Sequence, residues 1–416
     1  MIIKESVRHF ERYGLGIFVH FGLYSLWGRG EWIRKLGDIS GEDYESLISG
    51  FYPARDWAKQ LVSVAKCAGA RYITLTTRHH EGFSLYDTCG LSDFDALHSP
   101  CGRDLVGEFV DACREGGIVP FFYHTLLDWH ERSYSENFKE YLIFLRNSVE
   151  LLCTRYGKTG GFWFDGIWDK PDADWEEDRL YAIIRRYQPE AIIINNTGLN
   201  ARGALGHIEL DSVTFERGHP QPINREGAPK YIASEMSQTL YEHWGYCRND
   251  FQCKSLASLI EDYCACRRYG ANFLLNVGPM PDGYLRGLDR ELLIAFGEWM
   301  KINGERTRKA RPCDCSAERE SDFILRDEDR YYLFCYGLPM QVETNVVFSR
   351  SDGGYAGRLK FRGKIQSIRW LDNGRELQFE QRDDQVIVRD LYNRYGENYV
   401  VRVAEIFAEQ TEKTDD

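Results

Sequence analysis

This sequence lacks long apolar runs, an excess of positive charge and the cysteine spacing of a zinc site. No apolar stretch approaches the roughly 18 residues of a membrane-spanning helix, so we expect no membrane partner. The 416 residues carry 52 Lys and Arg against 64 Asp and Glu, a net charge of −12. Because nucleic-acid binding needs clustered positive charge, we expect no nucleic-acid partner either.

The 12 cysteines show no metal or disulfide pattern. Cys264-Ala265-Cys266 and Cys313-Asp314-Cys315 are C-x-C pairs, whereas zinc sites use C-x-x-C pairs. A chain of this length can bury a large core without such staples, so we predict reduced thiols. The first residues do not form a charged segment followed by an apolar one, as in a signal peptide, and the default expectation is a cytoplasmic protein.

Between residues 15 and 305, short apolar runs alternate with longer segments of helical periodicity. The runs predicted as strands are Leu15–His20, Tyr72–Thr77, Ile118–Tyr123, Gly161–Phe164, Ala191–Asn195, Ser212–Phe215, Lys230–Ser234 and Asn272–Val277. This alternation favours a parallel sheet, and eight strands over this length fit a (β/α)₈-like TIM barrel. Residues 196–230 contain no clear helix, which predicts an irregular barrel there. No G-x-G-x-x-G motif opens a helix, and we predict no cofactor.

After Pro312 the sequence changes to short alternating strands separated by turns such as Asp372-Asn373-Gly374. One of the expected strands is Asn345–Phe348. This pattern predicts a C-terminal antiparallel β-sandwich. The predicted domains are therefore a catalytic barrel over residues 1–311, a sandwich over 312–408 and a polar tail over 409–416.

Polar and aromatic residues follow the predicted strands, at the end of a barrel where active sites lie. The first run ends in His20, the second is followed by His79 and His80, and Asp165 directly follows the fourth. Two carboxylates across such a pocket are the groups that hydrolyse glycosides, one as nucleophile and one as acid. The candidates for the second carboxylate are Glu216, Glu235 and, less favoured, Asp211.

The histidines also allow a metal-dependent hydrolase as an alternative. Neither His-x-His on the first strand nor His-Glu-x-x-His occurs. Adjacent His79 and His80 on an extended strand would point to opposite sides, which makes a shared metal ion awkward. We therefore predict no metal site and interpret these histidines as hydrogen-bonding groups.

Five ordered motifs within residues 10–305 resemble the α-L-fucosidases of glycoside hydrolase family 29. They are Gly16–Ser25, Gly30–Trp32, Tyr72–Phe83, Phe162–Gly166 and Asn272–Pro279. The resemblance implies a retaining exo-α-L-fucosidase, with a barrel followed by a β-sandwich and with Asp165 as the nucleophile. The residues that it implies around the fucose are His20, Glu31, Trp32, His79, His80, Tyr123, Trp163 and Trp244, the last near the C5 methyl group.

The resemblance fixes the acid/base less firmly. Asp211–Glu216 looks like the family stretch that ends in this residue, so Glu216 is favoured and Glu235 is the alternative. Some members have an arginine after the fifth strand, where this sequence has Thr197-Gly198, and Arg202 or Arg217 are the candidate replacements. The expected substrate is a fucosylated oligosaccharide or glycoconjugate. A non-catalytic sugar-binding protein on a degenerate barrel and a related substrate such as a galactoside stay open.

Overall fold

The computed structural model describes residues 3–37, 39–226, 228–341 and 355–409 of the chain. The chain forms two compact units, Met1–Lys254 with Ala271–Ala295, and Ser255–Gly270 with Phe296–Asp416. The predicted division at residues 311 and 312 stays a prediction, since the second unit also takes in α10 (Leu256–Arg268). No helix among the described residues is long and apolar enough to cross a membrane.

The first unit is built on a closed barrel of eight parallel strands, each paired with its neighbours in chain order. The strands are β1 (Leu15–Val19), β2 (Tyr72–Arg78), β3 (Val119–Thr125), β4 (Gly161–Asp165), β5 (Ile192–Asn195), β6 (Ser212–Thr214), β7 (Ala233–Thr239) and β8 (Asn272–Val277). The predicted (β/α)₈-like barrel is therefore confirmed.

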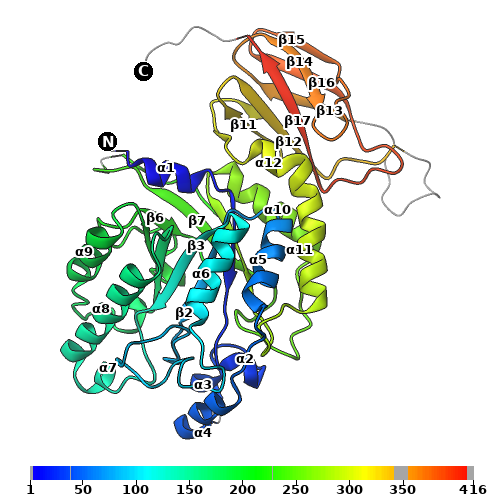
Figure 1. Ribbon diagram of the computed structural model, residues 1–416. Coiled ribbons are helices and arrows are strands. Elements are labelled where there is room, and N and C mark those ends of the chain that lie inside the picture. Colours follow the sequence, from blue (N-terminus) through cyan, green and yellow to red (C-terminus); the bar gives the residue numbers. More distant parts are fainter. Residues whose placement is uncertain (1–2, 38, 227, 342–354, 410–416) are drawn as a thin grey trace. The chain divides into compact units, whose positions relative to one another are not determined.

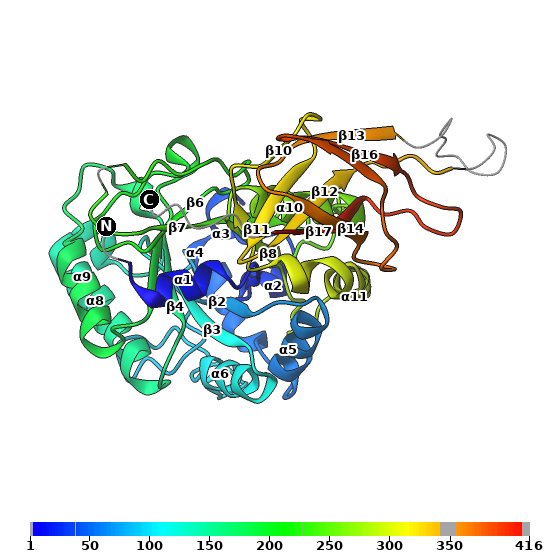
Figure 2. The same cartoon turned by 90° about the horizontal axis from the view of Figure 1, so that it is seen from above.

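Helices flank the strands on the outside of the barrel, as α5, α6, α8 and α9 show in Figure 1 and Figure 2. The helices of this unit are α1 (Glu5–Glu11), α2 (Tyr24–Trp27), α3 (Ile33–Leu36), α4 (Gly41–Glu45), η1 (Ser46–Gly50), α5 (Trp57–Cys67), α6 (Leu105–Gly116), α7 (Ser133–Glu136), α8 (Phe138–Arg155), η2 (Ile167–Asp169), α9 (Glu177–Tyr187) and η3 (Leu199–Ala201). Helix α6 illustrates their local signals. The Asp104 side chain accepts a hydrogen bond from Gly107 N at its start, and Gly117 ends it at φ +70°.

The barrel is irregular between β5 and β7. Strand β6 has three residues, and Ile194 and Ser212 are its one registered pair with β5. In the described connections from Asn195 to Ala233, η3 is the one helical element. This agrees with the absence of helical periodicity in that segment.

Strand β7 differs from its predicted position. The sequence predicts a strand over Lys230–Ser234 that Glu235 follows, whereas β7 runs over Ala233–Thr239 and Glu235 is its third residue. The reason is that β7 is polar, with Ser234, Glu235 and Ser237 all buried. An apolar pattern therefore does not reveal the strand.

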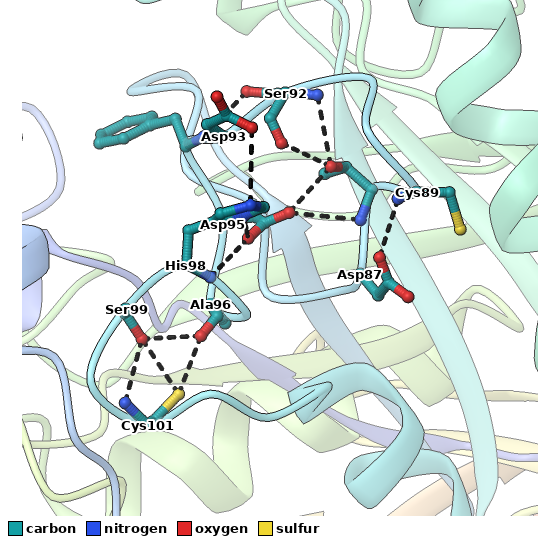
Figure 3. Close-up of polar contacts among 11 residues, drawn as sticks. Asp87, Cys89, Ser92, Asp93, Asp95, Ala96, His98, Ser99 and Cys101 are labelled. Carbon is teal, nitrogen blue, oxygen red and sulfur yellow. Dashed lines mark hydrogen bonds and ion pairs between the residues drawn. The ribbon is translucent and has the colours of Figure 1, made fainter.

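A network of polar contacts holds the long connection between β2 and α6 (Figure 3). The Asp95 carboxylate is fully buried and accepts hydrogen bonds from the Thr88 hydroxyl at 2.8 Å and from His98 N at 2.9 Å. It also pairs with His98 Nδ1 at 2.7 Å. The loop is therefore ordered by its own side chains close to the rim of the barrel.

The second unit contains two antiparallel sheets, as predicted. Their orders are β10-β13-β16-β15 and β14-β17-β12-β11-β9. The strands are β9 (Arg311–Pro312), β10 (Ser316–Ala317), β11 (Phe323–Asp327), β12 (Arg330–Tyr336), β13 (Tyr355–Lys360), β14 (Ile365–Trp370), β15 (Phe379–Arg382), β16 (Gln385–Leu391) and β17 (Val401–Ala408). Apolar residues from both sheets form one core, including Leu333, Trp370 and Val388.

Helices pack against these sheets and lead into them. Helix α10 packs against β9, β11 and β17. The chain reaches the sheets through α11 (Gly287–Trp299), the π-helical turn η4 (Met300–Gly304) and α12 (Glu305–Thr307). The predicted strand Asn345–Phe348 and residues 410–416 of the predicted tail lie outside the described residues.

Candidate active site

A cavity of about 530 Å³ opens at the carboxyl ends of the barrel strands. Nine of the eleven predicted site residues line it, namely His20, Trp32, His79, His80, Tyr123, Trp163, Asp165, Glu216 and Trp244. Glu31 and Glu235 are the two that do not. The lining also includes Phe18, Trp168, Asn196 and residues 197–200, which the sequence analysis did not select.

Asp165 lies at the end of β4 and is surrounded by hydrogen-bond donors. Its Oδ1 accepts from Gly166 N at 2.9 Å, Trp168 Nε1 at 3.2 Å and Asn196 Nδ2 at 3.1 Å. Its Oδ2 accepts from the Tyr123 hydroxyl at 3.1 Å and lies 3.4 Å from His80 Nε2. Burial raises the pKa of Asp165, but His80 and these donors outweigh it, so the pKa stays below its ordinary value.

Glu216 lies two residues after β6, and Asn196 connects it to Asp165. Asn196 Nδ2 donates to Glu216 Oε2 at 2.7 Å and to Asp165 Oδ1 at 3.1 Å. The amide orientation is fixed because Asn196 Oδ1 accepts from Gly198 N at 3.1 Å. Since the two bonds share one nitrogen, the sum of 2.7 Å and 3.1 Å, which is 5.8 Å, is the upper limit for the distance between these oxygens.

The environment of Glu216 raises its pKa, whereas the environment of Asp165 lowers the pKa of Asp165. Burial and the negative charge of Asp165 raise the pKa of Glu216, and the bond from Asn196 lowers it only in part. The cavity thus holds one carboxyl group biased toward the ionised form and one biased toward the protonated form. Such a divergent pair is typical of an acid and a nucleophile.

Three histidines form one wall of the cavity. His20 Nδ1 donates to Asn276 Oδ1 at 2.6 Å, because Asn276 Nδ2 is itself bound to Trp244 O. Burial lowers the pKa of His20 to about 3, so the ring is neutral and its Nε2 is a hydrogen-bond acceptor. A neutral imidazole of this kind is suited to a sugar hydroxyl.

The expectation that His79 and His80 point to opposite sides is wrong. Their ring centroids lie 4.2 Å apart, and both rings line the cavity. Strand β2 ends at Arg78, and its pairing with β3 shifts between Thr76 and Arg78, so the strict alternation of a strand no longer applies at these residues. Even so, no group of three His, Cys, Asp or Glu residues in the described ranges is arranged to hold a metal ion.

Glu31 supports the cavity from behind. It is 5% exposed, and its Oε2 accepts a hydrogen bond from Gly245 N at 2.8 Å, next to Trp244. The Arg217 guanidinium lies 5.2 Å from the Trp244 ring centre. Glu31 and Arg217 therefore position the indole of Trp244. Glu31 itself lies outside the cavity lining.

Glu235 does not lie at the rim, contrary to its selection as the alternative acid/base. Its carboxylate is fully buried and accepts from Trp163 Nε1 at 2.9 Å and from the Tyr72 hydroxyl. The phenol ring of Tyr72 passes over Gly16, where a Cβ atom would clash with it. As the third residue of β7, Glu235 sits below the cavity and orients the Trp163 indole.

Two lining residues that were not predicted, Asn196 and Trp168, also follow strand ends. Asn196 directly follows β5, and Trp168 lies three residues after Asp165 on η2. The end of β5 was visible in the sequence as an Asn-Asn pair, and that polar pair was the available signal for Asn196. Trp168 carries no signal beyond its aromatic side chain near a strand end.

Comparison with known proteins identifies the family. The model of the alpha-L-fucosidase family matches residues 4–305, well over half of the chain. The chain belongs to the alpha-L-fucosidase family. It is therefore a glycoside hydrolase, and the resemblance noted from the sequence motifs is confirmed.

Other members of the alpha-L-fucosidase family are similar over most of the chain. The tissue alpha-L-fucosidase of Bos taurus is 28% identical over 75% of this chain and 71% of its own length. Isoenzyme 1 of Paenibacillus thiaminolyticus has a TM-score of 0.79 at 26% identity and covers 97% of this chain and 100% of its own.

A further structure shows the same fold at lower identity. It is a family 29 alpha-L-fucosidase of Bacteroides thetaiotaomicron, captured as a trapped covalent intermediate with 2-fluoro-fucosyl fluoride. It has a TM-score of 0.80 at 22% identity and covers 98% of this chain and 97% of its own. A barrel followed by a sandwich is thus the shared architecture.

Proposed function

We propose that this chain removes terminal α-L-fucose from glycosides with retention of the anomeric configuration, Asp165 acting as nucleophile and Glu216 as acid/base. The observation that carries the proposal is the shared Asn196 nitrogen, which limits the distance between the carboxylate oxygens to 5.8 Å, the sum of its two hydrogen bonds. Retaining glycosidases have carboxyl groups about 5–5.5 Å apart, whereas inverting enzymes leave roughly 6.5–9.5 Å for a water molecule.

In the first step, an Asp165 oxygen forms a bond to the anomeric carbon as the bond from this carbon to the aglycone oxygen breaks. Oδ1 already accepts three hydrogen bonds, so Oδ2, with Tyr123 and His80, is the more available oxygen. Glu216 donates its proton to the leaving oxygen, which its raised pKa favours. The aglycone leaves as an alcohol.

In the second step, water replaces the aglycone. The Glu216 carboxylate accepts a proton from the water, the water oxygen bonds to the anomeric carbon, and the Asp165 ester bond breaks. Free fucose leaves, Asp165 is again ionised and Glu216 is again protonated. The same carboxyl group therefore serves as acid and then as base.

The remaining cavity residues suit a sugar with polar and apolar faces. His20 and His79 provide ring nitrogens for hydroxyl groups, His80 lies between Thr125 and Asp165, and Phe18, Trp163 and Trp244 provide apolar surface. Trp244 is the candidate contact for the methyl group at C5, the position at which a galactoside carries a hydroxymethyl group instead. This contact would favour fucose over the related sugar.

Labelling with 2-fluoro-fucosyl fluoride tests the proposal. The fluorine slows both steps, and the reactive leaving group lets the first proceed, so the fucosyl-enzyme should accumulate. We expect mass spectrometry to locate the added sugar on Asp165, and nuclear magnetic resonance of an aryl α-L-fucoside reaction to show α-fucose as the first product. A label on another residue, β-fucose as the first product, or binding without turnover would each overturn the assignment.

A further inference from the structure

The loop after β5 contributes cavity residues that the proposed mechanism leaves unused. Thr197, Gly198, Leu199 and Asn200 all line the cavity, and η3 begins at Leu199. Leu199 borders the cavity and is 52% exposed. Its surface therefore faces the mouth rather than the core.

This loop is attached to Glu216 at both ends. At its start, Asn196 Nδ2 donates to Glu216 Oε2 at 2.7 Å. At its end, Arg202 Nε donates to Glu216 O at 2.6 Å, and Gly203 N donates to Thr214 O at 2.8 Å. Since Glu216 is the proposed proton donor to the leaving oxygen, the leaving group must pass next to this loop.

Trp168 forms the neighbouring part of the mouth. Its indole stacks on Trp32 with ring centres 6.0 Å apart, and its Nε1 donates to Asp165 Oδ1 at 3.2 Å. Gly198 has φ +90°, and a Cβ there would lie 3.4 Å from Trp168 Cδ1. Gly198 thus brings the loop against the edge of Trp168 and leaves the next residue, Leu199, at the same opening.

The cavity is larger than one fucose unit requires. If each of the eleven non-hydrogen atoms of fucose took the roughly 30 Å³ that a water molecule has in the liquid, the sugar would fill at most about 330 Å³. The cavity measures about 530 Å³. Space therefore remains beside the sugar for part of a leaving group.

We propose that Leu199, Asn200 and the edge of Trp168 form a subsite for a flat, apolar aglycone such as an aromatic ring. The inference rests on the proposed function, because Glu216 defines the side on which the aglycone lies. Trp32 stacks on Trp168 and the loop at Gly198 lies against its Cγ and Cδ1 atoms, so the apolar groups at this mouth are an indole edge and the Leu199 side chain. Such a surface suits an apolar ring better than a hydroxyl-rich sugar, and the Asn200 amide offers one polar contact at its margin.

Two inhibitors separate this subsite from the fucose pocket. One is a fucose-configured iminocyclitol, and the other is the same compound carrying a phenyl group at the position of the aglycone. In calorimetry with the wild-type chain, we expect the phenyl group to tighten binding about tenfold, the effect of roughly half-burying an aromatic ring. Equal affinities for the two compounds would overturn the subsite.

Variants at Leu199 test whether this residue supplies the gain in affinity from the phenyl group. We expect Leu199→Ser to reduce the tenfold gain to about threefold or less, and Leu199→Phe to increase it, both without changing the affinity for the unsubstituted compound. Leu288→Ser is the matched control, because Leu288 is 60% exposed and lies outside the cavity lining. An unchanged gain in Leu199→Ser would overturn the assignment of Leu199. If the unsubstituted compound failed to bind, the proposed fucosidase function would fail as well.

Discussion

The regular half of the barrel (β1 to β5 and β8) and its irregular half (β6, β7 and their connections) position the two proposed catalytic carboxylates in different ways. Asp165 ends β4, which pairs with β3 over five registered pairs and with β5 over four. Glu216 follows β6, which has one registered pair with β5 and three with β7. Backbone pairing therefore holds the proposed nucleophile from both neighbouring strands. The proposed acid/base is held from the β7 side, where Phe215 N and Arg217 N donate to Glu235 O and Ser237 O, and by the side chain of Asn196.

This difference matches what each group must do. A nucleophile has to meet the anomeric carbon in line, so an error of about 1 Å costs much of the rate. A proton transfer also needs hydrogen-bond geometry, but it can follow leaving groups of different shapes from a loop. In the proposed mechanism, the irregular half of this barrel thus places the acid beside the leaving group.

Asp165→Asn should cause the largest loss of activity, because Asp165 is the proposed nucleophile. The amide cannot form the fucosyl ester, so we expect kcat for an aryl α-L-fucoside to fall by roughly 10⁴-fold or more. Thermal unfolding should stay close to wild type, because the amide can keep several of the hydrogen bonds. Retention of full activity by this variant would remove Asp165 as the nucleophile.

Glu216→Gln should have the next largest effect, and one that depends on the leaving group. Loss of a general acid costs about 10²–10⁴-fold, and the loss should be smaller for an activated aryl fucoside than for an alkyl fucoside. In the wild type, activity should fall as the pH rises through the raised pKa of Glu216 and also as the pH falls through the lowered pKa of Asp165. The variant should lose the alkaline decline, and a variant profile that keeps it would assign the acid to another group.

Asn196→Ala removes a side chain that donates to both carboxylates. Loss of a hydrogen bond to a charged group costs about 1.5–3 kcal/mol, or roughly 10–100-fold in kcat/KM. The bond from Asn196 lowers the pKa of Glu216, so its removal should move the alkaline decline to higher pH. A shift to lower pH would contradict the proposed geometry. Asn195→Ala is the control, because Asn195 Nδ2 bonds to the Tyr181 hydroxyl outside the cavity lining.

The strands of the regular half were predicted closely, and so was β6 in the irregular half. Strands β1 to β6 and β8 begin and end within two residues of their predicted bounds. The strand predicted for β7 begins three residues early and ends five residues early, since Ser234, Glu235 and Ser237 are polar and yet buried. The family motifs pointed to Asp165 and most of the lining.

Contacts between distant residues could not be predicted from the sequence. Glu235 meets Tyr72 across 163 positions in the chain, and Asn196 meets both carboxylates only once the barrel closes. Local sequence patterns do not predict such pairs. The position of a carboxylate relative to a strand end was therefore the weakest inference, and for Glu235, which lies within β7, it was wrong.

Glu235 allows the smallest and most specific test, because it is a buried carboxylate in the irregular half that lies below the cavity. Glu235→Leu should remove the carboxylate that accepts from the Trp163 N–H and from the Tyr72 hydroxyl, at a cost of about 1–3 kcal/mol for each lost bond. Glu235→Gln keeps an acceptor for Trp163 and a donor for the Tyr72 oxygen, so its stability should be close to wild type near neutral pH. Chemical denaturation of the two variants measures the difference.

The pH dependence of stability distinguishes this buried role from an acid/base role. Burial raises the pKa of Glu235 to about 7, so the folded chain holds a proton that the unfolded chain releases at its ordinary pKa near 4.5. The stability linked to this proton is complete below the unfolded pKa and is lost as the pH rises to about 7. Glu235→Gln should remove that part of the decline while the alkaline decline in activity, which belongs to Glu216, remains. If the activity profile changed instead, Glu235 would be the acid/base, and the shared nitrogen of Asn196 would not identify the catalytic pair.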